Sequence, residues 1–260
     1  MTVEPRLYLD ADFAQDAVLA LDKEQAHYLI TVMRRKAGDG VRVFNGRDGE
    51  WRAEVVEAGR RSASLRLAEQ TRPQVLPPDM ALYFAPVKKA RTDFIVEKAT
   101  ELGARAITPV MTARTMADRV KTERLVLIAR DAAEQTERLD LPQIGEPVSL
   151  TGLIKDWDAE RRLIFCDEAG EDADQPWGGA AGRAGSITDQ LSTVTADKWA
   201  ILIGPEGGFA PEERQLLRRQ AFVLPVALGP RILRADTAVV AAMSVWQAMC
   251  GDWSRRLTAL

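Results

Sequence analysis

Two short segments near the C-terminal end of the chain combine glycines with charged residues directly after apolar runs. The first spans 201–209 and reads ILIGPEGGF, and the second spans 228–238 and reads LGPRILRADTA. Glycine lets a ligand approach the backbone closely, and ligands of open α/β sheets bind beyond the carboxyl ends of the strands. An ordinary strand-to-helix turn needs only one glycine, so the first segment, with three, predicts a ligand-binding loop.

The two loops lack the motifs that bind phosphates and dinucleotides. Neither contains the Gly-Lys-Ser/Thr ending of a P-loop or the G-x-G-x-x-G spacing of a dinucleotide-binding loop. The carboxylate of Glu206 would repel phosphate, which favours a ligand with a cationic centre or neutral hydrogen-bonding edges. Arg231 and Arg234 favour contact with an anionic partner or a base edge. The alternative is a pair of surface arginines beside a helix capped by Asp236 or Thr237.

Basic residues cluster in two further places, although the whole chain has a formal net charge of −3. Residues 34–47 contain five bases and one acid, and Lys88, Lys89 and Arg91 follow a predicted strand. Such runs are often only solvated faces, but they also provide local surfaces for a polyanion. Residues 166–190 have the opposite character, with six acids and one base.

The few histidines and cysteines exclude several classes of site. His27 is the single histidine, and Cys166 and Cys250 lie far apart in the chain. We therefore expect no metal site, no disulfide framework and no Ser-His-Asp catalysis, unless His27 itself is the base. The chain has no window of 18 consecutive apolar residues and no signal-like N-terminus, which predicts a cytoplasmic protein without membrane spans.

The elements that must position these residues fall into two groups on either side of 70–79, QTRPQVLPPD. Three prolines in ten residues resist both helix and central strand, so this segment is interpreted as a linker. Before it, alternating patterns predict strands at 41–44, 51–57 and 63–68, with Asn-Gly and Asp-Gly turns between the first two. A helix is expected at 22–33. Several short strands in about 70 residues indicate a small barrel.

After the linker, apolar strands alternate with helices, which predicts a buried parallel sheet. The expected strands are 80–85, 105–110, 162–166, 199–203 and 223–228. The expected helices are 92–102, 119–138, 211–220 and 236–249. The acidic segment 167–198 has little apolar content and is predicted to be a disordered loop.

Five stretches together resemble the RsmE-type 16S ribosomal RNA (uracil-N3)-methyltransferases of the SPOUT superfamily. They are HYLITVMRRKAGDGVRVFNG at 27–46, KKARTDFIVEKATELGARAITPV at 88–110, EQTER at 134–138, LIGPEGGFAPEE at 202–213 and LGPRILRADTA at 228–238. The resemblance implies an α/β protein with a PUA-like β-barrel RNA-binding domain at 1–72, a linker at 73–79 and a trefoil-knotted, parallel-sheet SPOUT methyltransferase domain at 80–260.

The resemblance also implies a function. The cofactor would be S-adenosylmethionine, the partner 16S rRNA of the small ribosomal subunit, the product a uridine methylated at N3, and the assembly a homodimer. The apolar run at 238–250, wider than one buried stripe, agrees with a dimer. Two other readings remain: a methyltransferase for another RNA such as tRNA, and a non-catalytic RNA-binding dimer, against which the two glycine loops argue.

Site residues follow from the same resemblance. The cofactor-binding residues would be Leu202, Ile203, Gly204, Gly207, Gly208, Leu228, Gly229, Ile232, Leu233 and Thr237. The catalytic candidates are Arg234 and Arg138, as cations that stabilise the uracil oxyanion, and Asp236, as a base or only a helix cap. Ala235-Asp236 stands where the family usually has Thr-Glu. The RNA-binding candidates are Arg34, Arg35, Lys36, Arg42, Arg47, Lys88, Lys89 and Arg91.

Overall fold

The structure is a computed structural model that describes residues 4–59, 62–117, 119–172, 174–175 and 178–253. The chain forms two compact units. The first contains residues up to Leu76 together with Ala133–Leu141, and the second contains Pro77–Ala132 and the chain from Pro142 onward.

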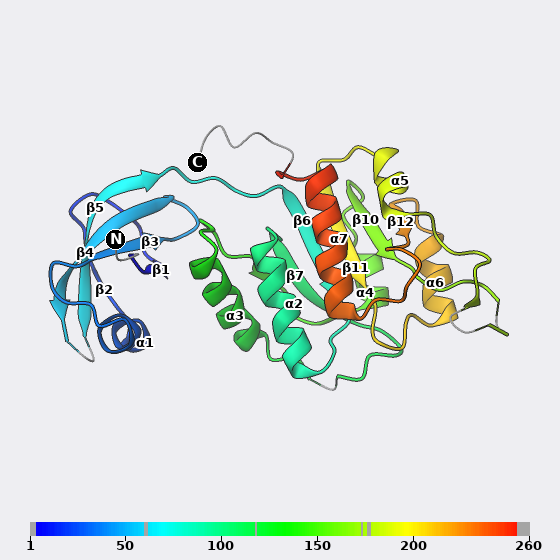
Figure 1. The fold of residues 1–260 in the computed structure, drawn as a ribbon, viewed down its shortest axis with the longest axis horizontal. Coiled ribbons are helices and arrows are strands. Elements are labelled where there is room, and N and C mark those ends of the chain that lie inside the picture. The colour runs from blue at the N-terminus through cyan, green and yellow to red at the C-terminus, as the bar shows by residue number, and fades with distance from the viewer. Residues whose placement is uncertain (1–3, 60–61, 118, 173, 176–177, 254–260) are drawn as a thin grey trace. The chain divides into compact units, whose positions relative to one another are not determined.

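The first unit is built on a curled five-stranded sheet (Figure 1). Its strands, in the order β1-β3-β4-β5-β2, are β1 (Arg6–Tyr8), β3 (Gly40–Phe44), β4 (Glu50–Ala58), β5 (Ala63–Arg72) and β2 (Val18–Ala20). All neighbours are antiparallel except β1 and β3. Register shifts within the β4–β5 pair interrupt its ladder, as bulges do where a sheet curls.

The helix expected at 22–33 is present in two parts. The α1 helix (Lys23–Ala26) continues into a π-helix over His27–Val32. Asp22 caps it, accepting a hydrogen bond from the Gln25 backbone while the Gln25 side chain bonds back to Asp22. Ala26 and Leu29 are fully buried among the apolar side chains of the sheet, so these helical turns close the core of the unit.

The second unit contains a parallel sheet with helices on both faces. The strand order is β12-β10-β11-β6-β7-β8. The short strand β9 pairs with Val110 and Met111, at the carboxyl end of β7. The strands are β6 (Asp79–Phe84), β7 (Ala106–Met111), β8 (Gln143–Ile144), β9 (Val148–Ser149), β10 (Arg161–Cys166), β11 (Lys198–Ile203) and β12 (Val223–Val226). The five longer strands confirm the five that the sequence predicts.

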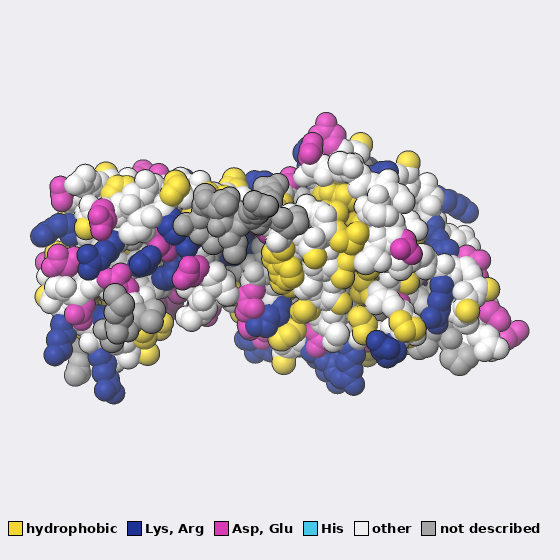
Figure 2. All heavy atoms as spheres, turned by 45° about the horizontal axis from the view of Figure 1, so that its top comes forward, with side chains coloured by type: hydrophobic (Ala, Val, Ile, Leu, Met, Phe, Trp, Pro, Cys, Tyr) yellow, Lys and Arg dark blue, Asp and Glu magenta, His cyan; other side chains and the backbone are white. Residues whose placement is uncertain are grey.

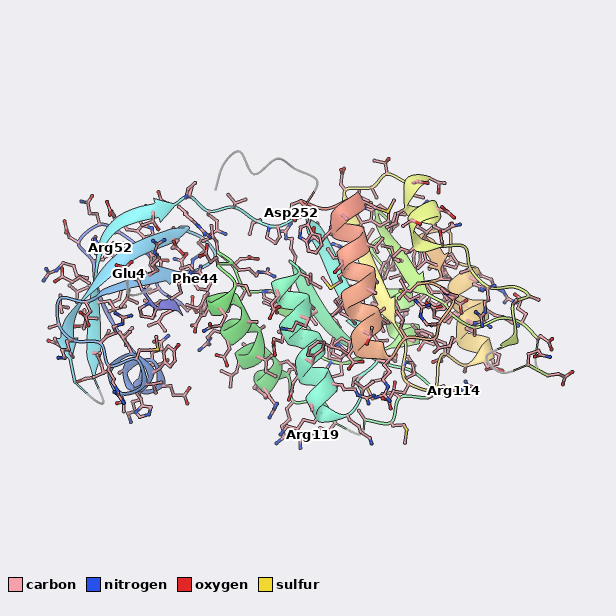
Figure 3. All side chains as sticks on the ribbon, viewed as in Figure 1. Glu4, Phe44, Arg52, Arg114, Arg119 and Asp252 are labelled. Carbon is pink, nitrogen blue, oxygen red and sulfur yellow. The ribbon has the colours of Figure 1, made fainter. Side chains whose placement is uncertain are left out.

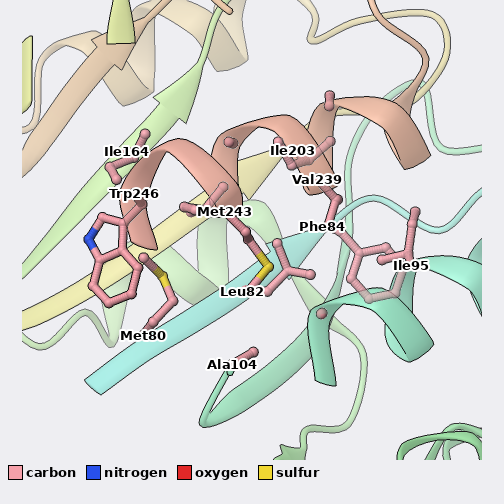
Figure 4. Close-up of a cluster of buried hydrophobic side chains, with 14 of the residues drawn as sticks. Met80, Leu82, Phe84, Ile95, Ala104, Ile164, Ile203, Val239, Met243 and Trp246 are labelled. Atoms are coloured by element: carbon pink, nitrogen blue, oxygen red, sulfur yellow. The ribbon is translucent and has the colours of Figure 1, made fainter. Parts of the chain in front are cut away.

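In the described part of the chain, six helices flank this sheet: α2 (Lys89–Glu101), α3 (Thr122–Gln135), α4 (Leu150–Lys155), α5 (Ile187–Ser192), α6 (Pro211–Arg218) and α7 (Ala235–Met249). Alternate residues of the strands point to opposite faces. Met80, Leu82 and Phe84 of β6 pack with α2 and α7 (Figure 4), whereas Ala81 belongs to the cluster that includes Leu217 of α6. Figure 1 shows α2 and α7 side by side over one face.

The prediction of disorder over 167–198 is wrong for its second half. Residues 187–192 form α5, capped by Ser186, with Ile187 and Leu191 buried in the main core. The backbone N–H of Ile187 also donates to the carbonyl of Ala227. Two apolar side chains at helical spacing are enough to anchor a six-residue helix against a core. Residues 173, 176 and 177 of this segment lie outside the described residues.

Within the described chain, no helix has both the length and the apolar character needed to cross a bilayer. Both cysteines are free thiols. Cys166 ends strand β10 and is buried. This burial raises the pKa of the thiol strongly, so it stays protonated and unreactive at neutral pH.

Candidate active site

All the strands of the second unit that precede a predicted functional segment end at one edge of the sheet, because they are parallel. β11 leads into the first glycine loop, β12 into the second, and β6 into the basic residues at the start of α2. β10 lies between β11 and β12. The sheet therefore brings both predicted cofactor loops to the same edge, with the chain that follows β10 between them.

In the first loop the glycines serve different purposes. A Cβ on Gly204 would lie 2.5 Å from the Phe209 ring, and Phe209 packs edge-on against Phe165, so Gly204 makes room for core packing. Gly208 has φ +69°, which favours glycine. Gly207 is exposed, and a Cβ there would make only ordinary contact with Arg114. Leu202 and Ile203, also predicted to bind cofactor, are buried at the end of β11.

Two arginines fasten this loop to neighbouring elements. Arg114, labelled in Figure 3 and placed just after β7, donates to the Gly207 carbonyl at 2.9 Å. Arg91 forms an ion pair with Glu206, and its Nε lies 3.9 Å from Oδ2 of Asp236. Arg91 therefore joins the first loop to the second, a role that its prediction as an RNA-binding residue does not include.

The second loop is open at its centre. Gly229 has φ +128°, and a Cβ built on it would meet nothing within 4 Å. Leu228 and Leu233 are half-buried and pack against the core, whereas Ile232 is exposed. The combination of two anchored leucines and an unfilled backbone position leaves space beside Gly229 that a ligand can occupy.

The residues that begin α7 carry the charges of this loop. Arg234 is the exposed N-cap residue, and its side chain makes no capping hydrogen bond. Asp236, in the first turn, accepts the backbone N–H of Thr237 at 3.0 Å, and Thr237 itself is exposed. Ala235, where the family usually has threonine, is buried.

Sequence reasoning missed the functional potential of Asp167 and Glu168, which follow β10. Asp167 is buried and accepts hydrogen bonds from Arg214 and Arg218 of α6. Oε1 of Glu168 accepts the Leu228 backbone N–H at 2.7 Å, and burial raises the pKa of this carboxyl. The available signal was their position directly after a buried strand at the edge where ligands bind.

The basic residues at the amino end of α2 lie at the same edge of the sheet. Lys88 and Lys89 are exposed, and the first turn of α2 contains no acid. Cations at a helix N-terminus are unfavourable because the backbone dipole is positive there. The two lysines and the positive end of the backbone dipole together make this turn a suitable position for a phosphate.

The remaining predicted residues lie in the first unit. Arg138 follows α3, which ends at Gln135, and pairs with Asp140 at 2.8 Å with 8 % of its side chain exposed. Arg42 pairs with Glu50 and Glu4, and Arg47 contacts Asp10 and Asp12. The other predicted RNA contacts are the exposed residues Arg34 and Lys36 and the half-buried residue Arg35.

Comparisons with known proteins match both units of the chain. A family model of the RNA methyltransferase domain matches residues 74–247, and a model of the RNA methyltransferase PUA domain matches residues 21–68. Ribosomal RNA small subunit methyltransferase E of Rickettsia conorii is 30 % identical over 240 residues, which cover 92 % of this chain and 93 % of the relative. Its Synechocystis counterpart is 32 % identical over 94 % of this chain and 77 % of the relative.

Solved structures give the same result. A methyltransferase structure from Legionella pneumophila with bound SAM matches with a TM-score of 0.84 and 27 % identity, over 96 % of this chain and 100 % of that one. The ribosomal RNA small subunit methyltransferase E of Neisseria gonorrhoeae, bound to S-adenosyl methionine, has a TM-score of 0.83 and 25 % identity over the same shares. The chain therefore belongs to the RNA methyltransferase family and combines its PUA domain with its methyltransferase domain.

Proposed function

We propose that this protein transfers a methyl group from S-adenosylmethionine to N3 of a specific uridine in the 16S rRNA of the small ribosomal subunit. The observation that carries the proposal is that two glycine loops meet at one edge of the parallel sheet. Arg234 lies in the second loop, and its side chain makes no capping hydrogen bond to α7. Membership of the RNA methyltransferase family, and relatives named for the small ribosomal subunit, support the substrate class.

The residues at this edge fit S-adenosylmethionine. The cofactor is a cation with several hydrogen-bond donors and no phosphate. The edge offers the carboxyl group of Glu168 and, beside Arg91, those of Glu206 and Asp236. Gly229 leaves open space at the backbone, and Oε2 of Glu168 is buried with no hydrogen-bond partner among the described residues. The residues proposed to hold the cofactor are Leu202, Ile203, Gly204, Gly207, Gly208, Leu228, Gly229, Ile232, Leu233 and Thr237.

Transfer to uracil requires removal of the N3 proton and control of the charge that results. When bound, the cofactor supplies an electrophilic methyl group on its sulfonium. The target base leaves its stack to reach the loops, and Asp236 accepts the N3 proton. Arg234 stabilises the negative charge that spreads onto the uracil oxygens when N3 loses its proton. Positioning supplies much of the remaining catalysis.

Arg234 is the first candidate for this cation because nothing among the described residues neutralises it. Arg138, the second candidate, already has the carboxylate of Asp140 as its partner. The basic residues proposed to contact RNA also divide, within the described chain, into those without and those with a carboxylate partner. Arg34, Lys36, Lys88 and Lys89 are exposed, whereas Arg42, Arg47 and Arg91 each face a carboxylate.

We also propose a homodimer in the cytoplasm and a trefoil knot in the methyltransferase domain. Figure 2 shows hydrophobic side chains gathered on the second unit, and the partly exposed apolar residues of this unit include Phe94, Ile232 and Met249. Burial of such a patch against a second copy would stabilise the dimer. Sedimentation at micromolar concentration should give a dimer, and a monomer would contradict this part of the proposal.

The test of the proposed function is transfer of labelled methyl groups to purified small ribosomal subunits and to tRNA. Small ribosomal subunits from cells that lack the protein should accept about one methyl group each, in 16S rRNA and as N3-methyluridine. tRNA should accept none. Methylation of tRNA instead would assign the enzyme to another RNA, and absence of transfer to any RNA would favour the non-catalytic reading.

A further inference from the structure

The chain directly after β10 is held rigidly against α6. Asp167, with 2 % of its side chain exposed, accepts hydrogen bonds from Nε of Arg214 and Nε of Arg218, each at 2.8 Å. Arg214 also donates to the carbonyls of Ala169 and Gly170. Two guanidinium groups on one buried carboxylate form a strong, directional anchor, so the backbone that carries Glu168 has little freedom.

Glu168 extends from this anchored segment to the second glycine loop. Its Oε1 accepts the Leu228 backbone N–H at 2.7 Å. Its Oε2 is buried and has no hydrogen-bond partner in the part of the chain that the structure describes. Because β10 lies between β11 and β12, this oxygen lies at the sheet edge between the two loops proposed to hold the cofactor.

A buried carboxylate oxygen without a donor is unfavourable. Burial is the largest influence on the Glu168 carboxyl and raises its pKa, and the opposing effects of the Leu228 N–H and of the Arg183 charge do not cancel it. Rotation of the carboxyl group cannot satisfy both oxygens, since only one of them faces the Leu228 N–H. A ligand that brings a donor to Oε2 therefore removes an existing penalty when it binds.

We propose that Glu168 is a cofactor-binding residue and that its Oε2 accepts a hydrogen bond from the adenosine part of S-adenosylmethionine. This inference rests on the proposed function. The methyl group must face an incoming RNA base, which leaves the nucleoside and the amino-acid part of the cofactor as partners for Glu168. The nucleoside offers neutral donors, which are its hydroxyl and amino groups. A neutral donor matches this half-buried carboxyl, because burial disfavours its charged form.

The informative variant is Glu168→Gln, which keeps the size of the side chain. Its amide oxygen can still accept the Leu228 N–H, but an NH₂ group, which is a donor, then replaces Oε2. Glu171→Gln is the matched control, because Glu171 lies three residues later, is exposed and pairs only with Arg218 among the described residues. The probes are S-adenosylhomocysteine and 5′-methylthioadenosine, which lacks the amino-acid part, with affinities measured by calorimetry.

Glu168→Gln should weaken binding of both probes about 10–100-fold, the range of a lost hydrogen bond to a charged group, while Glu171→Gln leaves both unchanged. Without ligand, Glu168→Gln should unfold at the wild-type temperature or above it. Wild-type affinity of the variant for both probes would overturn the inference. If Glu168→Gln weakens the binding of S-adenosylhomocysteine but not that of 5′-methylthioadenosine, the contact with the nucleoside is wrong. It is also wrong if the wild-type protein binds S-adenosylhomocysteine but not 5′-methylthioadenosine.

A structural role is distinguished by the ligand-free protein. If Glu168→Gln lowers the unfolding temperature without ligand, Glu168 holds the loop rather than the cofactor, and the inference is wrong. Failure of the wild-type protein to bind either probe is a different result, because it would remove the proposed function itself.

Discussion

Arg234 carries the most specific prediction at the level of single residues. Its guanidinium makes no hydrogen bond or ion pair with the residues that the structure describes, and it caps α7 only through its backbone. Arg234→Ala should lower the single-turnover methylation rate about 10²–10³-fold, as loss of one oxyanion donor does. Arg234→Lys should remain impaired, because lysine lacks the planar fork.

The measurement is single-turnover methylation of small subunits at saturating cofactor. Calorimetry with S-adenosylhomocysteine provides the control, since both variants should bind it as the wild type does. A near-wild-type rate for Arg234→Ala would remove Arg234 from the mechanism and leave Arg138 as the candidate cation.

Glu50 carries a prediction about stability and pH. It is buried in the first unit, and its two oxygens accept hydrogen bonds from Arg6 and Arg42, each at 2.8 Å. Burial opposes ionisation, but these two hydrogen bonds outweigh it and lower the pKa of Glu50. Glu50→Gln should reduce the free energy of unfolding by about 3 kcal/mol at pH 7, because it leaves Arg6 buried without its countercharge.

The sign of the pH dependence follows from the lowered pKa. The stabilisation by Glu50 is present above the pKa of the unfolded chain and is lost as the pH falls through the folded pKa. Urea unfolding should therefore show the difference between wild type and Glu50→Gln shrinking in acid. Glu57→Gln, exposed on the same strand, should match the wild type throughout. A difference that stays constant down to pH 2 would contradict this assignment.

At the level of elements, the glycines of the first loop predict different mutational effects. Gly207→Val should leave the fold intact, because a Cβ there makes only ordinary contacts, and should weaken S-adenosylmethionine binding at least tenfold by filling the space beside the loop. Gly204→Val should instead destabilise the protein through its collision with Phe209. Gly208 is a poorer test, because any side chain there is strained at φ +69°.

Calorimetry and thermal unfolding of the Gly207→Val and Gly204→Val variants separate these effects. If Gly207→Val binds S-adenosylmethionine as tightly as the wild type, this face of the loop is not part of the cofactor site.

Elements with a long, regular pattern could be predicted from the sequence, and short ones could not. The buried strands β6, β10 and β11 are short apolar runs and α7 is a long one, so their positions follow from the length of each run and the polar residues that bound it. By contrast, β8 and β9 have two residues each, too few to show any period. The α5 helix was missed because the acidic residues before it dominate the composition of the segment.

The candidate site was predictable to a similar degree. The glycine loops are visible as motifs, and their shared edge follows from parallel strands. The bridge from Arg91 to Glu206 and Asp236 and the bond from Glu168 to Leu228 join residues between 60 and 145 positions apart. No local pattern contains such contacts, because they arise only when the strand order brings their loops together.

At the level of the whole molecule, RNA binding should depend on which basic side chains of the first unit are exposed and which already face a carboxylate. This distribution predicts how RNA affinity responds to salt. Arg34 and Lys36 are exposed, whereas the charge of Arg47 is already offset by Asp10 and Asp12. RNA affinity should fall steeply with salt, since phosphate contacts release counterions. Arg34→Ala with Lys36→Ala should weaken binding and reduce the slope of log K against log salt by about 2.

Arg47→Ala is the matched control and should change that slope less. Filter binding of 16S rRNA between 50 and 200 mM salt, a range in which such effects are about 10³–10⁵-fold for proteins with many phosphate contacts, measures both. If the slope is the same for the wild type and the double variant, the first unit does not provide the RNA surface.

The most direct test of the account is the modification state of 16S rRNA in cells. Mass spectrometry of nuclease fragments should show one N3-methyluridine in the wild type, an unmodified uridine at that position when the gene is deleted, and recovery with the wild-type gene but not with Arg234→Ala. An unchanged set of modified nucleotides in 16S rRNA after deletion would contradict the proposed function.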